Sequence, residues 1–279
     1  MKPIDRRSFL LASGAAVALA ACGGSSGKAT NWQLDQRFPQ DLMVPGKQRL
    51  AFSISDTTSL LSDGPDVMTG HIVDSAGKTV VASISAKKRR VTEGIVYWDF
   101  HPELDKVGIY YLHVKGGDST GGAIGINDPA TVSVPYLGQQ LPPFDTPTTA
   151  DGRGVNPICT RLTGGPCPFH SITLTQALAA GKPVAYMIGT PAPCQFGTCA
   201  PGLEFLINAG KRLGDRVSIV HAEVYTDNTV TAASPAMDAY NLTFEPVLFM
   251  ADKTGKIVTR LEGTWDQSEL DETMNALVA

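Results

Sequence analysis

Several features are scarce in this sequence, and their scarcity excludes whole classes of protein. The uncharged apolar stretch at residues 9–21 is well short of the roughly 20 residues that a helix needs to cross a bilayer, and no second such stretch follows it. Basic residues are not in excess, because 23 Lys and Arg stand against 27 Asp and Glu. The one basic cluster is Lys87-Lys88-Arg89-Arg90, which we expect to be a solvated turn. An acidic chain of this kind argues against binding to nucleic acid and against electrostatic adhesion to anionic lipid.

The N-terminus has the architecture of an export signal. Lys2, Arg6 and Arg7 precede the apolar stretch, which ends in Leu-Ala-Ala-Cys22 followed by a Gly/Ser segment. The motif Asp5-Arg6-Arg7-Ser8-Phe9-Leu10 resembles the twin-arginine signals that direct folded proteins to export, and the small residues before Cys22 resemble a lipobox. We therefore expect residues 1–21 to be removed and Cys22 to carry lipid. The protein would then be held on the extracytoplasmic face of the cell membrane, with the lipid bilayer as a partner.

Only five cysteines occur, and four remain once Cys22 is assigned to lipid. Outside the cytoplasm an even number of thiols is expected to pair, and four cysteines allow three connectivities. The spacing groups them as Cys159 with Cys167 and Cys194 with Cys199, so we predict two local disulfides. For the first pair, which lies in a loop, a structural disulfide is the favoured interpretation.

The composition changes twice along the chain and predicts two folded domains. After a tether at residues 22–31, residues 32–135 contain short alternating apolar runs at 49–55, 70–74, 79–85, 95–100, 110–115 and 130–134. These runs predict an all-β, antiparallel sandwich of immunoglobulin-like type. Its histidines, His71, His101 and His113, are scattered, so no metal site is predicted there. Five prolines from residue 135 to residue 157 indicate a linker, assigned to residues 136–170, that is not expected to pack.

The second domain, residues 171–279, alternates strands and helices. Strands are predicted at 184–188, 217–225, 247–250 and 257–261, and helices at 202–213, 235–240 and 269–278, after a short helix that opens near Ser171 or Thr173. The first strands are nearly continuous apolar runs, as in a parallel sheet that is covered on both faces. This order of elements resembles that of thioredoxin-like proteins, over roughly residues 172–279, and predicts an α/β thioredoxin fold.

The resemblance also locates a candidate site. Cys194-Gln-Phe-Gly-Thr-Cys199-Ala-Pro201-Gly202 lies between the first strand and the next helix, where that family keeps its redox cysteines. Glu245-Pro246 precedes the third strand and matches the family's cis-proline, which implies a surface for substrate at Glu245, Pro246 and Pro201. At the start of a helix, backbone N–H groups and the helix dipole stabilise a thiolate. We therefore expect Cys199 to be the attacking thiol and Cys194 to be its resolving partner.

The motif departs from the family's pattern, and two functions stay open. Gly202 stands where the resolving cysteine of a CxxC belongs, Thr198 stands where the usual tryptophan is found, and the thiols form a CxxxxC pair. One hypothesis is a membrane-anchored thiol-disulfide oxidoreductase that acts on exported or envelope proteins with thiols or disulfides and needs no cofactor. The other is a redox-silent thioredoxin-like module that binds a peptide or envelope protein, in which Cys194 and Cys199 only stiffen the loop. No metal ligand is predicted: His221 is interpreted as a core or edge residue of a strand, and a Cys/Cys/His copper site would need a different cysteine spacing.

Overall fold

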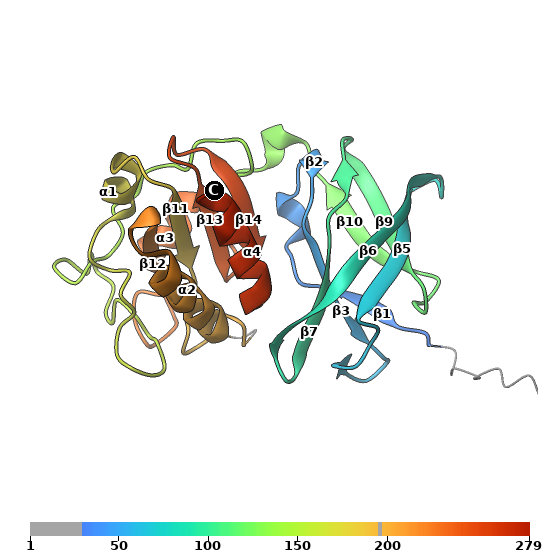
Figure 1. Ribbon diagram of the computed structural model, residues 1–279, viewed down its shortest axis with the longest axis horizontal. Coiled ribbons are helices and arrows are strands. Elements are labelled where there is room, and N and C mark those ends of the chain that lie inside the picture. Colours follow the sequence, from blue (N-terminus) through green and yellow to red (C-terminus); the bar gives the residue numbers. More distant parts are fainter. Residues whose placement is uncertain (1–29, 195–196) are drawn as a thin grey trace, which may run out of the picture.

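A computed structural model describes residues 30–194 and 197–279 of the chain. Figure 1 shows two domains side by side, an antiparallel β domain and an α/β domain, with helix α4 (Gln267–Leu277) between the second sheet and the first domain. The predicted signal at residues 1–21 and the predicted lipid attachment at Cys22 lie outside the described residues. In the part of the chain that is described, no helix is long and apolar enough to cross a membrane.

The first domain is built on one antiparallel sheet of eight strands. Its order is β1-β3-β7-β6-β5-β9-β10, with β4 paired to β3. The strands are β1 (Gln33–Gln36), β3 (Leu50–Ser55), β4 (Leu60–Leu61), β5 (Val67–Asp74), β6 (Thr79–Thr92), β7 (Ile95–Phe100), β9 (Gly108–Val114) and β10 (Gly122–Ile126). A short ribbon joins β2 (Gly46–Lys47) to β8 (Glu103–Leu104).

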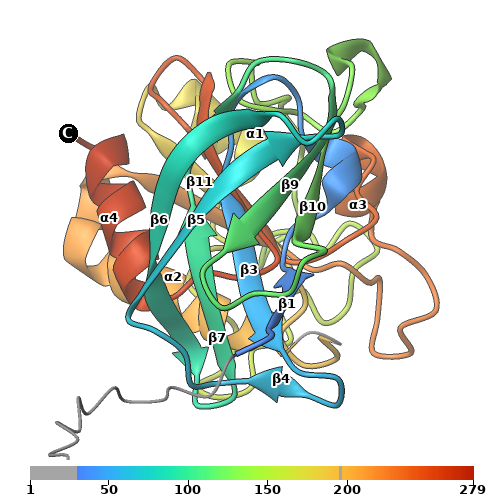
Figure 2. The ribbon, with the colours of Figure 1, turned by 90° about the vertical axis from the view of Figure 1, so that its right-hand side faces the viewer.

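The sheet bends back on itself around the long strand β6. The first half of β6 pairs with β5 and its second half with β7, so this one strand belongs to both layers. The two ends of the sheet also meet, because the side-chain amide of Gln36 on β1 donates to the carbonyl of Ala123 on β10. Figure 2 shows the resulting near-barrel. Apolar side chains of both layers fill its core, among them Phe52, Trp98, Ile72, Leu112 and Ile124. The expected antiparallel β domain is therefore confirmed, as a continuous near-barrel sheet.

Three details of this domain differ from the sequence-based expectation. The basic cluster is not a solvated turn: it lies within β6, where Arg89 is buried and its guanidinium donates to Asp99. The run at 130–134 is not a strand, since its first two residues belong to a 3-10 helix at Pro129–Thr131. The last strand is instead β10, whose Gly-Ala-Ile-Gly-Ile sequence has weak strand propensity because glycine has no side chain to pack.

The second domain has the strand order and helix placement of a thioredoxin-like fold. Its sheet runs β12-β11-β13-β14, and β11 pairs in parallel with β12 and antiparallel with β13. The elements are α1 (Leu174–Ala179), β11 (Val184–Ile188), α2 (Cys199–Leu213), β12 (Ser218–Ala222), α3 (Pro235–Tyr240), β13 (Val247–Ala251), β14 (Ile257–Glu262) and α4. The predicted thioredoxin-like domain is confirmed, with β11 and α3 at their predicted bounds.

Helices cover both faces of this sheet, which explains why its strands are apolar throughout. Side chains of α2 and α4, such as Leu206 and Met274, pack with Met187 on one face. Side chains of α1 and α3, such as Leu174 and Tyr240, pack on the other. Each residue of β11 and β13 is buried. Successive side chains of a strand point to opposite faces, so both faces need apolar residues here.

The proline-rich segment is not an unpacked linker. Leu141 is buried in the core of the α/β domain, and Thr146 is fully buried. The backbone of residues 138–141 makes hydrogen bonds with Gly255 and Ile257, so the segment runs beside β14 like a further edge strand. Prolines remove N–H donors but leave the carbonyls and the remaining amides free to pair. One such carbonyl, that of Pro142, accepts from the hydroxyl of Tyr240.

The two domains meet through buried charges. Arg49 of the first domain makes a bidentate pair with Glu269 of α4, at 2.5 and 2.8 Å, and both side chains are largely buried. The hydroxyl of Tyr97 donates to the same carboxylate. A cleft of about 690 Å³ opens beside this contact. The side chains that line it include Arg49, Arg89 and Glu269, whose charges are already paired across the interface.

Candidate functional site

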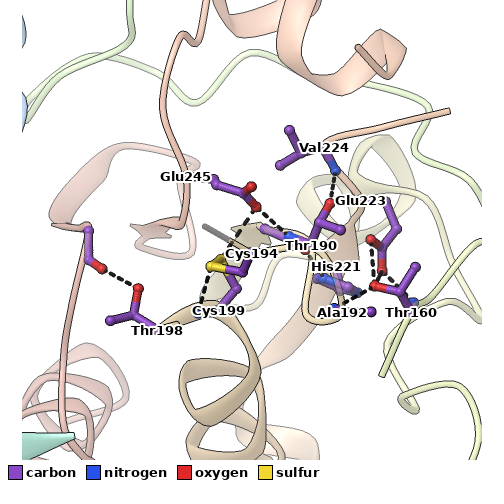
Figure 3. The surroundings of a disulfide bond; sticks show 12 residues. Thr160, Thr190, Ala192, Cys194, Thr198, Cys199, His221, Glu223, Val224 and Glu245 are labelled. Atoms are coloured by element: carbon purple, nitrogen blue, oxygen red, sulfur yellow. Dashed lines mark hydrogen bonds between the residues drawn. A yellow bond between two sulfur atoms is a disulfide. The ribbon is translucent and has the colours of Figure 1, made fainter. Parts of the chain in front are cut away.

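The predicted dithiol forms a disulfide between the first strand and the second helix of the α/β domain. Cys194 lies in the loop after β11, and Cys199 is the first residue of α2. The two are bonded, with their Cα atoms 6.0 Å apart. Figure 3 shows this disulfide next to Glu245 and Thr190. The predicted pairing of Cys194 with Cys199 is therefore what the structure contains.

The two cysteines of the disulfide differ in burial. Cys199 is fully buried, whereas Cys194 is partly exposed. The backbone N–H of Cys199, at the start of α2, points to the sulfur of Cys194 at 3.4 Å. The helix N-terminus thus faces the Cys194 sulfur, because Cys194 folds back over the first turn. The reason that favoured Cys199 as the attacking thiol, stabilisation of a thiolate by the helix start, applies to Cys194.

Glu245 supplies a buried carboxyl group to the disulfide. Its Oε2 lies 3.4 Å from the sulfur of Cys199 and accepts a 2.6 Å hydrogen bond from the backbone N–H of Thr190. Burial raises the pKa of Glu245 to about 7; the hydrogen bond from Thr190 offsets part of this rise, and the charge of Glu223 adds a smaller one. A carboxyl group with such a pKa can hold or release a proton near neutral pH beside a leaving thiolate. Glu245 was expected only as part of a substrate surface.

The neighbouring residues confirm the proline geometry and explain the departures from CxxC. The bond between Glu245 and Pro246 is cis, as the resemblance implied. Pro201 lies in the first turn of α2, where a missing N–H is harmless. A side chain at Gly202 would collide with the indole of Trp265, whose Cζ2 lies 2.9 Å from the position of a Cβ atom. The place of the usual resolving cysteine is therefore occupied by Trp265. The hydroxyl of Thr198 donates to the carbonyl of Gly263, beside the same indole.

The second cysteine pair is not a disulfide in the structure. Cys159 and Cys167 are free thiols, both buried, in the segment that precedes α1. The structure places two fully buried histidines against them, His170 from the same segment and His221 from β12. The ligand atoms of all four side chains lie within 4.8 Å of one another. A hydrogen bond with Cys167 holds the pKa of Cys159 well below its ordinary value, and contacts with His170 and His221 act in the same direction.

Sequence reasoning found the sulfurs of this cluster and missed the histidines. His170 follows Cys167 by three residues, but His221 lies 51 residues further on, and only the pairing of Phe169 with β12 brings it close. A histidine in the middle of the apolar strand Ser-Ile-Val-His-Ala was the available signal, since a buried imidazole needs partners for its nitrogens.

The sequence matches no protein-family model and no curated protein. Among solved structures, it is similar to a thiol:disulfide interchange protein of the thioredoxin family from Chlorobium tepidum TLS, at 13% identity and a TM-score of 0.35, covering 52% of this chain and 99% of that one. It is also similar to chloroplastic thioredoxin z, at 18% identity and a TM-score of 0.31, covering 37% and 86%. A third is the exposed lipoprotein thioredoxin of Streptococcus pneumoniae strain TIGR4, at 17% identity and a TM-score of 0.29, covering 36% and 90%. The strand order and the helices described above define the second domain as thioredoxin-like.

Proposed function

We propose that this protein is a thiol-disulfide oxidoreductase in which Cys194 is the sulfur that exchanges with substrates. The observation that carries the proposal is the asymmetric disulfide: Cys194 is a partly exposed residue whose sulfur faces the N-terminus of α2, and Cys199 is buried beside a carboxyl group. A stapling disulfide needs no such division, whereas an exchanging one uses an accessible sulfur and a protected leaving group.

The reaction starts from the disulfide seen in the structure. A substrate thiolate attacks the Cys194 sulfur, a bond forms between the two, and the Cys194–Cys199 bond breaks. The electron pair of that bond goes to Cys199, which takes a proton from neutral Glu245. A second substrate thiolate then attacks the substrate sulfur of the mixed disulfide and displaces Cys194 as a thiolate. The substrate is oxidised to a disulfide, and the protein is reduced by two electrons.

A surface for the substrate backbone lies next to the sulfurs. The backbone N–H and C=O of Glu245 make no backbone hydrogen bond with any residue of 30–194 or 197–279. Pro246, which follows it, begins the turn into β13, where the carbonyl of Pro246 accepts from Gly263. An extended peptide that pairs with Glu245 would place its cysteine near Cys194. Exported proteins with thiols or disulfides are the substrates that we propose.

The location and the first domain complete the proposal. A lipid on Cys22 would hold the enzyme on the extracytoplasmic face of the membrane, and the tether would space it from the bilayer. Cell fractionation of Cys22→Ala tests this, since the variant should no longer be found with the membranes.

We further infer that the β domain is immunoglobulin-like, because its order β1-β3-β7-β6 followed by β5-β9-β10 corresponds to the four- and three-stranded layers of that fold.

Mixed-disulfide trapping tests the proposed chemistry. Cys199→Ser leaves Cys194 with no internal thiol to release a captured substrate, so it should accumulate mixed disulfides that reductant removes. Cys194→Ser, the matched control, leaves only the buried Cys199 and should trap little. Strong trapping by Cys194→Ser alone would restore the opposite polarity. Trapping by neither variant, with a reduction potential below about −300 mV, would favour the redox-silent binding module instead.

A further inference from the structure

We propose that Cys159, Cys167, His170 and His221 form a structural zinc site, separate from the disulfide. Two thiols and two imidazoles are the donor set of Cys₂His₂ zinc centres. The sequence predicted a disulfide and no metal here. The structure instead gathers four buried donors whose ligand atoms all lie within 4.8 Å of one another.

The spacing of the donors matches a tetrahedral zinc ion. With Zn–S near 2.3 Å and Zn–N near 2.0–2.1 Å, a regular tetrahedron separates two nitrogens by about 3.3 Å and a sulfur from a nitrogen by about 3.6 Å. In the structure, His170 Nε2 lies 3.2 Å from His221 Nδ1. The sulfur of Cys167 lies 3.6 Å from the same Nδ1. Both distances agree with the edges of that tetrahedron.

The surroundings of the four side chains also suit a metal centre. The Nε2 of His221 lies 2.8 Å from the carbonyl of Gly189, which fixes Nε2 as the protonated nitrogen and leaves Nδ1 free for a metal. The backbone N–H of Cys167 donates to the sulfur of Cys159 at 3.3 Å and stabilises a thiolate there. A disulfide between Cys159 and Cys167 would use neither imidazole, and it would leave the two buried nitrogens facing each other.

The loop that carries the thiols is held in place by its own contacts. The carboxylate of Glu223, which is buried, accepts from the backbone N–H of Thr160 at 2.6 Å, next to Cys159. Arg161 makes a bidentate pair with Glu204 of α2, at 2.5 and 2.8 Å. Because the donors are positioned before the metal arrives, binding costs little ordering of the chain. Both cysteines bind zinc as thiolates, so any proton that they carry is released as Zn²⁺ enters.

The site lies close to the redox site without sharing a residue with it. Figure 3 shows His221 and Glu223 across Thr190 from the disulfide. The carbonyl of Gly189 accepts from His221, and the next residue, Thr190, donates to Glu245. Zinc would therefore fix the start of the loop that carries Cys194. Its role would be structural, because four protein ligands leave no open position.

Metal binding by the reduced full chain tests the proposal. We expect one zinc ion per chain by elemental analysis, and intense visible bands of tetrahedral cobalt when Co²⁺ is the probe. His221→Ala and His170→Ala should weaken binding by more than the roughly 10–100-fold that loss of an outer partner costs. The Cys194→Ser/Cys199→Ser double variant and His101→Ala, which changes an exposed histidine of the first domain, should bind as the parent does.

Several results would overturn the site. One is a reduced parent chain that binds neither ion. Another is binding that depends on Cys194 and Cys199 but survives both histidine changes. A Cys159–Cys167 disulfide in unreduced peptide maps of the exported protein would also exclude it. If a histidine variant fails to fold, as judged by circular dichroism, the zinc stoichiometry and the cobalt spectrum of the parent still decide the matter. Substrate trapping by Cys199→Ser is independent of all these outcomes.

Discussion

At the scale of single residues, Glu245 has the most direct influence on the proposed chemistry. Its carboxyl group touches the buried sulfur of Cys199, and burial raises its pKa to about 7. Below that pH the group is neutral and can give a proton to the departing thiolate. Above it the group is a carboxylate, which offers no proton and repels the negative charge that forms on sulfur.

Glu245→Gln should therefore lower the rate of disulfide transfer to a small thiol below pH 7 by on the order of 10²-fold. It should also abolish the inflection near pH 7 in the rate profile, because an amide does not titrate in this range. Stopped-flow measurement of the rate between pH 5 and 9 checks both expectations. Asp238→Asn, which changes an exposed residue of α3, is the control and should keep the parent profile. An unchanged profile in Glu245→Gln would remove its role in proton transfer.

The same pKa shift affects stability in a defined direction. A carboxyl group whose pKa is raised in the folded state binds its proton more tightly there than in the unfolded chain. Its contribution to stability is fully present below the unfolded value of 4.5 and is lost as pH rises through about 7. Parent and Glu245→Gln should diverge in this window, since the glutamine carries no charge to bury. Urea unfolding at pH 5 and pH 8 measures the difference.

At the scale of elements, the start of α2 is shaped by its contact with the segment after β14. Gly202 faces the buried indole of Trp265, and its carbonyl lies 3.4 Å from the indole nitrogen. Gly202→Ala should lower the free energy of unfolding by about 1–3 kcal/mol, because the added methyl group overpacks this contact. Gly210→Ala, later in the same helix, meets the flexible end of Ile219 and makes ordinary contact with the ring of Phe169, so it should stay within about 1 kcal/mol of the parent. Urea unfolding compares them. Equal stability of Gly202→Ala and the parent would contradict the close packing.

The elements also show how far sequence alone could reach. Apolar runs such as residues 184–188 and capping signals such as Thr173 predicted the strands and helices of the α/β domain, with bounds that differ from the structure by up to about three residues, because burial on both faces leaves a strong pattern. Strand β10 was missed because Gly122 and Gly125 dilute its alternation. Within the predicted apolar run 79–85, Val80 is 44% exposed, since β6 has a solvent-facing side there.

The residues of the candidate sites also fall into those that the sequence could predict and those that it could not. A dithiol within six residues and a proline before a strand are local signals, so Cys194, Cys199 and Pro246 could be assigned from their order. Which sulfur is accessible depends on how the loop folds over α2. The encounter of His221 with Cys167 depends on the pairing of a loop with an edge strand. The spacing of residues in the sequence predicts neither the accessible cysteine nor the contact of His221 with Cys167, because both depend on long-range packing.

At the scale of the whole molecule, the interface between the domains depends on a few buried charges. Arg49 comes from the β domain and Glu269 from α4, and each is mostly out of water. The pKa of Arg49 is raised: burial alone would lower it, but the carboxylate of Glu269 outweighs that effect. Tyr97 adds a hydroxyl to the same carboxylate, and its oxygen accepts from the backbone N–H of Asp266. Loss of one partner would leave the others buried without compensation.

Glu269→Ala should therefore cost about 3–5 kcal/mol, the range for breaking a buried ion pair from one side. Glu272→Ala is the control. It removes an exposed partner of Arg89 and should cost at most about 1 kcal/mol. In Arg49→Ala/Glu269→Ala no buried charge of this pair is left alone, so the double variant should lose less than the sum of the single variants. A double-mutant cycle measures this: urea unfolding, followed by tryptophan fluorescence, of the parent, Arg49→Ala, Glu269→Ala and the double variant. Additive losses of stability would mean that the two side chains stabilise the interface independently. A Glu269→Ala protein as stable as the parent would mean that other contacts hold the domains together.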